Sequence, residues 1–387
     1  MVLSHPCHQP INRSVYRELT LRHQIPVHLV VPRQLNVGGL WRDTPQTAPD
    51  AYDLTMLNLS GSHGRLQYFE NLAPVVSSWS PTHILVDNDP ASLMTWQAAK
   101  TAPKAQLWAL TAENLMPRYG RDLLAGIRSL NPRLILGPLL TWSLRKLVHP
   151  KVHRVFTLSS DGTRVMERLG FQGKATQIPL GFDPQLFQIQ PPSQRADTRL
   201  KLGLNQTTIA YFGRLTPEKG LHLLIQALAS MQDLNWQFLV DHFSDYRTAY
   251  TRELEAQIAA AGISHRVVYF DSNHTEMPNF MNAADIVVLP SVSTPKWKEQ
   301  YGRVLPEAMA CGRVVVGSDS GAIPELVGSF GHIVPEGDAS ALALKLRQLL
   351  ASPSLESEGQ NASTYAHSHL SLVRQAEIWA SLLTGPS

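Results

Sequence analysis

Short apolar runs alternate with amphipathic segments along the whole chain. Runs of four to six mostly apolar residues, bounded by turn residues, are typical of buried strands, and helical patterns lie between them. This alternation predicts α/β units built on parallel sheets in both halves. The strands expected in the first half span residues 27–31, 53–57, 83–87, 106–111 and 155–158. Those expected in the second half span residues 208–212, 236–240, 266–270, 285–289 and 313–317.

One segment between the halves breaks this pattern. Residues 184–205 contain a Gln-Pro-Pro-Ser sequence, which is typical of a linker. We therefore predict two doubly wound domains, an N-terminal one at residues 1–190 and a C-terminal one at residues 191–369. Residues 370–387 form a helical pattern that is a candidate to pack back on the N-terminal domain.

Composition narrows the class of protein. The 387 residues are 43% hydrophobic and 17% charged, as in a globular protein with enough chain for two cores. A net charge of +3 gives no reason to expect nucleic acid, and it suits anionic substrates or a membrane surface equally well. Two cysteines are too few for a disulfide framework or a thiolate metal site. The first residues lack a signal-peptide pattern, so we expect a cytoplasmic protein.

The most informative motif pairs two glutamates, Glu299 and Glu307, with seven residues between them. This spacing does not put both side chains on one helix face. Gly302 follows the first glutamate, and Pro306 and Gly312 suit the start and end of a short helix. Amides at a helix N-terminus bind phosphate, and flanking carboxylates can hold hydroxyl groups on either side. That order of groups matches a nucleotide-sugar.

A second motif, Gly213-Arg214 followed by Lys219-Gly220, comes directly after an expected strand. Arginine supplies a fork of donors and lysine a point charge, so a pair five residues apart can bracket a diphosphate. A basic pair in a loop is more often solvated surface when it stands alone. Because both motifs fall at similar loop positions of the same domain, we favour a shared functional site.

Together these motifs resemble the family 4 retaining glycosyltransferases of the GT-B fold, in which two Rossmann-like domains face an interdomain cleft. The resemblance also includes Leu180-Gly181-Phe182-Asp183 and the run from Val314 to Glu325. It covers nearly all of the second domain. In the first domain it rests on Gly38-Gly39 and on the general strand order.

The resemblance implies a role for each matching residue. Arg214 and Lys219 would neutralise the donor diphosphate, Glu307 would hold the ribose hydroxyls, and Glu299 would contact the transferred sugar near its reacting carbon. The donor site would be completed by backbone around Gly213, Gly302, Arg303 and Val304. Gly38 and Gly39 would allow close approach from the opposite domain. Such enzymes need no metal, because basic side chains and helix N-termini stabilise the departing diphosphate.

This chain departs from the family pattern in two places. Many relatives have a histidine after the 106–111 strand, where this chain has Thr111-Ala112-Glu113-Asn114. Glu113 is then either an acceptor-side group that binds a hydroxyl or a carboxylate that caps the next helix, and His63 is a second candidate nearby. The other departure is Asp241, where relatives often have a glycine-rich turn, and this affects how the base is recognised.

The tripeptide Asp87-Asn88-Asp89 resembles a metal-nucleotide motif of the other large glycosyltransferase fold. It lies in the expected acceptor domain, and it precedes Pro90 at a strand end. We favour a structural role in that turn.

Residues 138–154 mix apolar residues, Trp142 and a basic cluster. One interpretation is an interfacial helix that contacts anionic lipid and a lipid-linked acceptor. The other, which we favour from sequence, is a core-facing helix with a solvated basic end. The apolar stretch at 134–148 is interrupted by Gly137-Pro138 and Arg145-Lys146, so we do not expect it to span a membrane.

The resemblance therefore implies a retaining, metal-independent glycosyltransferase with no cofactor. Its partners would be a nucleotide-diphosphate-sugar donor and a glycan or lipid-linked acceptor, with no nucleic acid. The alternatives are a nucleotide-sugar epimerase or hydrolase and a catalytically silent nucleotide-sugar-binding subunit. The intact Glu299/Glu307 and Arg214/Lys219 pairs favour transfer.

Overall fold

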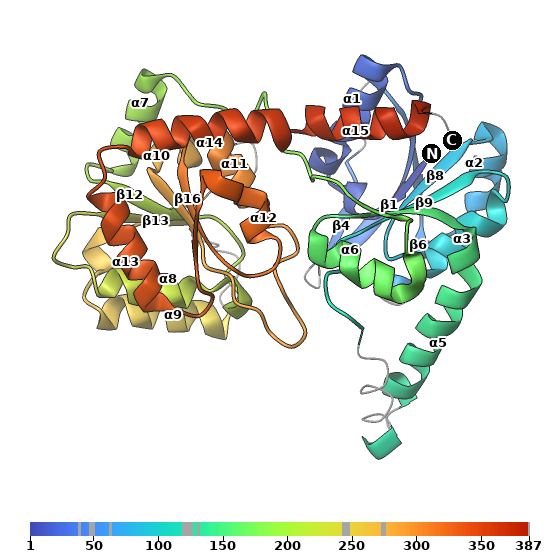
Figure 1. The fold of residues 1–387 in the computed structure, drawn as a ribbon, viewed down its shortest axis with the longest axis horizontal. Coiled ribbons are helices and arrows are strands. Elements are labelled where there is room, and N and C mark those ends of the chain that lie inside the picture. Colours follow the sequence, from blue (N-terminus) through green and yellow to red (C-terminus); the bar gives the residue numbers. More distant parts are fainter. Residues whose placement is uncertain are drawn as a thin grey trace. The chain divides into compact units, whose positions relative to one another are not determined.

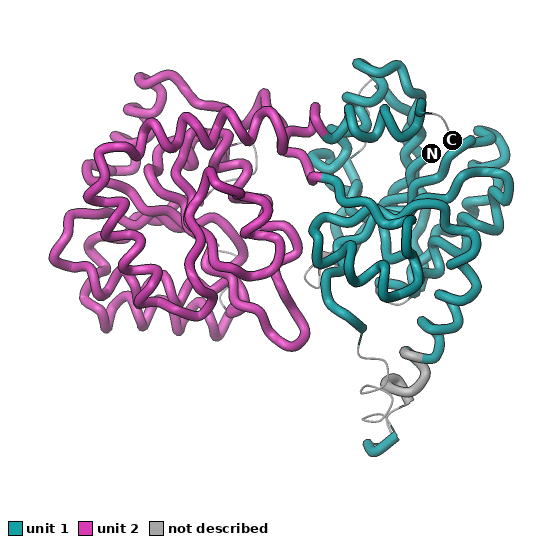
Figure 2. Tube along the Cα trace, in the orientation of Figure 1, with its two compact units in different colours: residues 1–178, 375–387 teal, residues 179–374 magenta. Residues whose placement is uncertain are grey.

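The structure is a computed structural model that describes residues 1–37, 40–45, 51–61, 64–117, 127–129, 132–241, 248–271 and 276–385. The chain forms two compact units, shown in different colours in Figure 2. Unit 1 comprises Met1–Ile178 and Gln375–Ser387, and unit 2 comprises Pro179–Arg374. Unit 2 therefore begins earlier than the domain boundary expected at residue 191.

Unit 1 is built on a parallel sheet with seven strands among the described residues, in the order β11-β10-β9-β8-β1-β2-β5 (Figure 1). These strands are β1 (Val2–Ser4), β2 (His28–Pro32), β5 (Asp53–Leu57), β8 (His83–Asp87), β9 (Gln106–Thr111), β10 (Val152–Thr157) and β11 (Ala175–Gln177). Alternate residues of a strand enter different cores. In β8, for example, Ile84 and Val86 belong to one buried cluster and Leu85 to another. Both faces of this sheet are therefore covered.

Helices and two small hairpins complete unit 1. The helices are α1 (Ser14–His23), α2 (Leu72–Trp79), α3 (Leu93–Thr101), α5 (Pro132–Val148), α6 (Ser160–Met166) and α15 (Leu372–Thr384), which belongs to unit 1 from Gln375 onward. The hairpins pair β3 (Gln34–Val37) with β4 (Leu40–Asp43) and β6 (Leu59–Ser60) with β7 (Tyr68–Phe69). The last turns of α15 join this core, because the Trp379 ring lies 4.4 Å from that of Phe156 and stacks 6.2 Å from that of Trp108.

Unit 2 has a six-stranded parallel sheet in its described part, in the order β14-β13-β12-β15-β16-β17. Its strands are β12 (Thr208–Tyr211), β13 (Gln237–Asp241), β14 (Val267–Phe270), β15 (Ile286–Leu289), β16 (Val314–Ser318) and β17 (His332–Val334). The central strands β12, β15 and β16 are buried along their whole length, so helices cover both faces.

The helices of unit 2 form two layers around this sheet (Figure 1). One layer contains α8 (Leu221–Ala229), α9 (Ala249–Ala260) and α13 (Ala339–Leu350). The other contains α7 (Pro192–Leu202), α10 (Met277–Ala283), α11 (Val304–Ala310) and α14 (Leu355–His369). The short helix α12 (Ile323–Val327) follows β16.

Several features differ from the sequence prediction. The segment expected to be a linker contains helix α7, whose Arg195 forms an ion pair of 2.5 Å with Asp285. The strands β1, β11 and β17 were not predicted, although β1 pairs with both β2 and β8. Helix α5 begins at Pro132, before residue 138 where the helix was expected to start. The remaining predicted strands are confirmed, with shifts at some of their ends.

Candidate functional site

The loop that follows β12 carries the predicted basic pair. The Tyr211 hydroxyl donates to the Arg214 carbonyl at 2.8 Å, and a 3-10 turn at Pro217–Lys219 leads into α8. Gly220 adopts a left-handed φ of +72°, and a Cβ there would lie 1.9 Å from the Pro290 carbonyl oxygen. Only glycine fits this close approach between two loops. The approach positions Lys219 directly before the N-terminus of α8.

The second loop runs from β15 to α11 and packs against the first. The Val292 amide donates to the Glu218 carbonyl at 2.8 Å, which ties the two loops together. At the other end of the loop, the Glu299 carbonyl accepts from the Ala322 amide at 3.2 Å. Gly321 approaches so closely that its Cβ would lie 1.9 Å from the same carbonyl oxygen. The backbone on both sides of the Glu299 side chain is thereby fixed.

These loops bring Lys219 and Glu299 into direct contact. Lys219 Nζ lies 2.6 Å from Glu299 Oε2, and the two side chains are only 13% and 5% exposed. Ser291, which is fully buried, donates its hydroxyl to the same carboxylate oxygen at 2.8 Å. The two charges thus balance each other at low exposure, where charge-assisted hydrogen bonds are strong.

Lys219 retains binding capacity in this arrangement. An ammonium group has three donors, and Glu299 is its single hydrogen-bond acceptor among the residues that the structure describes. The Trp297 ring also lies near this ammonium group, with its centroid 5.1 Å from Nζ. Two N–H donors of a mostly buried cation therefore remain for an anionic ligand.

Glu307 lies in the first turn of α11 and is 6% exposed. Burial raises the pKa of its carboxyl group to about 8, although the charge on Arg303 works in the opposite direction. Within the described ranges its carboxylate has no hydrogen-bond or ion-pair partner. A buried carboxyl group without a partner is costly, and such groups mark candidate ligand sites.

The other predicted donor-side residues lie in the same two loops. Arg214 is exposed, and its side chain makes no ion pair with any described residue. Gly302 has a left-handed φ of +81°, Arg303 is half-buried, and Val304 begins α11. Gly213 lies between β12 and Arg214. The structure thus places all the donor-side candidates in unit 2 and brings Lys219 and Glu299 into contact.

Glu113, the acceptor-side candidate, belongs to unit 1 and forms part of an ion-pair cluster beyond β9. Arg65 Nη2 lies 3.1 Å from Glu113 Oε2 and 2.9 Å from Asp89 Oδ2. Burial raises the pKa of Glu113, Arg65 lowers it, and Asp89 raises it. Sequence reasoning did not identify Arg65, because its contacts depend on three segments far apart in the chain.

The Asp-Asn-Asp segment has the structural role that we favoured. Asp89 Oδ1 accepts from the Ala91 amide at 2.7 Å, which stabilises the turn before α3. Asp87 accepts from the Ser4 hydroxyl at 2.8 Å, and burial raises the pKa of Asp87 to about 6. The described residues contain no cluster of three His, Cys, Asp or Glu side chains that could hold a metal ion. Gly38, Gly39 and His63 lie outside the described residues.

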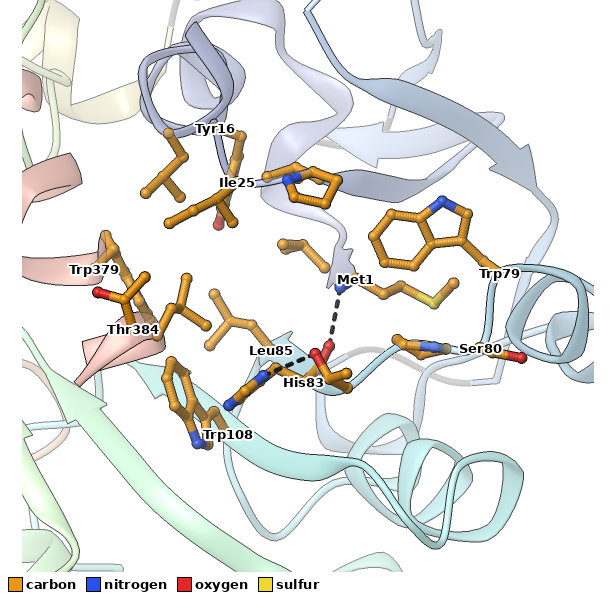
Figure 3. A pocket seen from close by; sticks show the side chains of 17 residues that line it. Met1, Tyr16, Ile25, Trp79, Ser80, His83, Leu85, Trp108, Trp379 and Thr384 are labelled. Atoms are coloured by element: carbon orange, nitrogen blue, oxygen red, sulfur yellow. Dashed lines mark hydrogen bonds between the residues drawn. The ribbon is translucent and has the colours of Figure 1, made fainter. Parts of the chain in front are cut away.

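Unit 1 also contains a cavity of about 500 Å³ with a largely apolar lining. Figure 3 shows it between Tyr16, Trp79, Trp108 and Trp379. His83, the first residue of β8, lines it, whereas Asp87 is the last residue of the same strand. The cavity therefore lies at the amino ends of the strands, away from the end where Asp87 and Glu113 lie.

Residues 194–367 match the model of a family described as glycosyl transferases group 1. The lipopolysaccharide core biosynthesis mannosyltransferase LpcC of Rhizobium leguminosarum bv. viciae is 30% identical over 211 residues, which are 52% of this chain and 57% of that protein. The phosphatidyl-myo-inositol mannosyltransferase of Mycobacterium leprae is 29% identical over 299 residues, 75% of this chain and 71% of that protein. The chain spans about half the length of the first curated relatives it matches.

The structure is similar to that of HepE from Anabaena in complex with UDP and glucose. The TM-score is 0.72 at 22% identity, covering 100% of this chain and 99% of the other. This likeness shows the fold, so the two parallel-sheet units form a GT-B protein. The family match lies wholly within unit 2 and includes Arg214, Lys219, Glu299 and Glu307.

Proposed function

We propose that this chain is a retaining glycosyltransferase that moves a sugar from a nucleotide-diphosphate-sugar to an acceptor hydroxyl. The observation that carries the proposal is a pair of buried ionisable groups in unit 2 that still have binding capacity. Lys219 has unused donors, and Glu307 has no partner among the described residues. Burial of such groups without partners is costly, and a ligand with anionic and hydroxyl groups would satisfy both.

On the donor side, Lys219 and Arg214 would bind the diphosphate, and Glu307 would accept hydrogen bonds from the ribose hydroxyls. Glu299 would contact the transferred sugar while it remains paired with Lys219 at 2.6 Å. The fixed backbone of Gly302, Arg303 and Val304 would lie along the phosphates. This assignment rests on the resemblance to family 4 and on the positions of these residues in two loops tied by backbone contacts.

In the reaction, the bond between the anomeric carbon and the diphosphate oxygen breaks as the acceptor oxygen attacks from the same face. The acceptor hydroxyl passes its proton to the departing diphosphate. Lys219 and Arg214 stabilise the negative charge that develops on this leaving group, a role that needs no metal ion when the positive charges are already oriented. Retention of configuration follows from attack on the leaving-group face.

On the acceptor side, we propose that Glu113 binds an acceptor hydroxyl and that Arg65 holds Glu113 in place. The ion pair of 3.1 Å orients the Glu113 carboxylate. Because Glu113 is already partly buried, it loses little further hydration when it accepts a hydrogen bond from an acceptor hydroxyl. The relatives named above act in lipopolysaccharide core biosynthesis and on phosphatidyl-myo-inositol. These names support a glycan or lipid-linked acceptor.

We also propose that helix α5 contacts anionic membrane surfaces. Thr141, Leu144 and Val148 form its buried face. The other side exposes Leu139, Trp142 and Leu147 at 46%, 44% and 54%, and Lys146 Nζ lies 3.7 Å from the Trp142 ring. Exposed apolar side chains beside basic ones suit the interface of a bilayer. Among the described residues, no helix has the length and apolar character to cross a membrane.

The experiment that tests the function is substitution of Glu299 by glutamine. Glutamine has nearly the same shape and can accept the Ser291 hydrogen bond, but it removes the charge that faces the donor sugar and Lys219. We expect transfer to fall by about 10² or more, whereas nucleotide binding stays within a few fold. Kinetic assays with each donor sugar and calorimetry with the nucleotide provide the two readouts. Full transfer activity in Glu299→Gln would refute the assignment.

A further inference from the structure

Trp297 lies beside the proposed donor site and has no role in the function described so far. The loop folds back on itself between Thr294 and Trp297, whose amides donate to each other's carbonyls at 2.7 and 3.4 Å. The Lys296 amide also donates to the Thr294 hydroxyl at 3.2 Å. This tight turn returns the half-buried indole toward the site, whereas Thr294 and Lys296 remain exposed.

The position of the indole is fixed relative to Lys219. The same loop is bound to the Lys219 turn through the Val292 amide and the Glu218 carbonyl, at 2.8 Å. It also ends at Glu299, the ion-pair partner of Lys219. With its centroid 5.1 Å from Nζ, the Trp297 ring is within range of a cation–π attraction. Trp297 and Glu299 therefore both lie close to the ammonium group.

We propose that Trp297 is a positioning residue that orients the Lys219 ammonium toward the terminal phosphate of a nucleoside diphosphate. This inference rests on the proposed function of the site. A lysine side chain loses considerable rotamer freedom when it is fixed on a ligand, and a rigid aromatic wall removes part of that cost beforehand. The ring also excludes water from one side of Nζ, so the unused donors face the ligand. Trp297 thus acts through Lys219.

The test compares two affinities in one protein. Binding of UDP, GDP and ADP is measured by calorimetry, and the tightest of these is compared with its monophosphate. We expect Trp297→Leu to weaken diphosphate binding by about three- to tenfold and to leave monophosphate binding unchanged. Trp297→Phe keeps an aromatic face and should restore most of the loss. Lys219→Ala should remove the preference for the diphosphate.

The matched control is Trp142→Leu, which removes a different lysine–tryptophan contact, in unit 1, and should change neither affinity. Equal losses for diphosphate and monophosphate in Trp297→Leu would overturn the inference, and so would no loss at all. If Trp297→Phe and Trp297→Leu lose the same amount of diphosphate affinity, that result would also count against a role of the aromatic face. If Lys219→Ala loses the preference and Trp297→Leu keeps it, the proposed function stands and this inference fails. If the unmodified protein binds no diphosphate, both fail.

Discussion

At the scale of single residues, two ionisable groups are buried without enough partners. Lys219 is almost enclosed, yet it has one hydrogen-bond acceptor among the described residues, and Glu307 has none. Proteins rarely retain such groups in their interior unless they bind something. Ser291 has a different role, because its buried hydroxyl donates to the same Glu299 carboxylate oxygen that contacts Lys219.

The sequence predicted the residue types of this site, but it did not predict their contacts. Motif spacing identified Lys219, Glu299 and Glu307, since these positions follow strand ends in a recognisable order. Ser291 and Trp297 lie in a loop whose conformation depends on a backbone contact with Glu218, a residue far away in the sequence. Such loop-to-loop packing has no periodic signal in the chain, so these two residues could not be identified from sequence alone.

Glu307 gives rise to a pH-dependent prediction. Its carboxyl pKa is about 8 in the folded protein and near 4.5 in an exposed group. Between these values the folded state holds a proton that the unfolded chain has lost, so stability falls as pH rises through this window. Glu307→Gln removes this loss. We expect the variant to gain about 1–3 kcal/mol over the unmodified protein between pH 5 and pH 8.

This prediction is measured by urea unfolding of both proteins at pH 5 and pH 8. Glu358→Gln is a suitable control, because the pKa of Glu358 is lowered in the folded protein by hydrogen bonds from Ser354 and His332. Replacing Glu358 should therefore not raise the unfolding free energy of the variant above that of the unmodified protein as pH rises. A stability difference for Glu307→Gln that is the same at both pH values would contradict a raised pKa at this position.

At the scale of helices and strands, apolar runs predicted most of both sheets, because buried parallel strands are almost continuously hydrophobic. Strand β1 escaped prediction since Val2–Ser4 is too short for a pattern, and its central place depends on pairing with β2 and β8. Helix α7 escaped prediction because it has no fully buried residue. Its position is fixed instead by the ion pairs that Arg195 and Arg199 make with Asp285.

The close approach of Gly220 to Pro290, between the two loops of the site, predicts the effect of substituting this glycine. Gly220→Ala forces a left-handed conformation on alanine and places a Cβ 1.9 Å from the Pro290 carbonyl oxygen, so the loops must separate. We expect a loss of about 3 kcal/mol in unfolding free energy and at least tenfold weaker donor binding. Gly203→Ala is the matched control, since Gly203 has a φ of +68° and open space around it.

Gly203→Ala should cost about 1 kcal/mol and leave donor binding unchanged. Urea unfolding and nucleotide calorimetry on both variants distinguish conformational strain from the loop contact. Equal effects of the two substitutions on donor binding would show that the approach of Gly220 to Pro290 does not position the site.

Helix α5 carries the second prediction at this scale. Sequence analysis favoured a core-facing helix, and the structure shows a buried face together with exposed apolar side chains. We expect the protein to float with anionic vesicles, and Arg145→Glu with Lys146→Glu to weaken binding by about tenfold or more. Lys201→Glu with Arg252→Glu makes the same change in net charge in unit 2 and should leave flotation intact. No binding to anionic vesicles, or equal binding of both variants, would end the membrane proposal.

At the scale of the whole molecule, the two units contribute differently to the account. Unit 2 contains the family match and all the donor-side groups, so its chemistry can be argued from motifs as well as contacts. Unit 1 lies outside that match, and its acceptor-side proposal depends on the contacts of Glu113 with Arg65. The repeated α/β pattern predicted the fold of both units, because helices cover both faces of each sheet and its strands are therefore apolar along their length.

The central claim is that unit 2 binds a nucleotide-diphosphate-sugar through Lys219. The most direct measurement is calorimetric binding of a panel of UDP-, GDP- and ADP-sugars to the full chain, to Lys219→Ala and to Lys296→Ala, which removes an exposed lysine in the neighbouring loop. The account predicts that at least one sugar nucleotide binds, that Lys219→Ala weakens it by tenfold or more, about 1.4 kcal/mol, and that Lys296→Ala does not. Absence of binding across the panel, or equal binding to all three proteins, would contradict it.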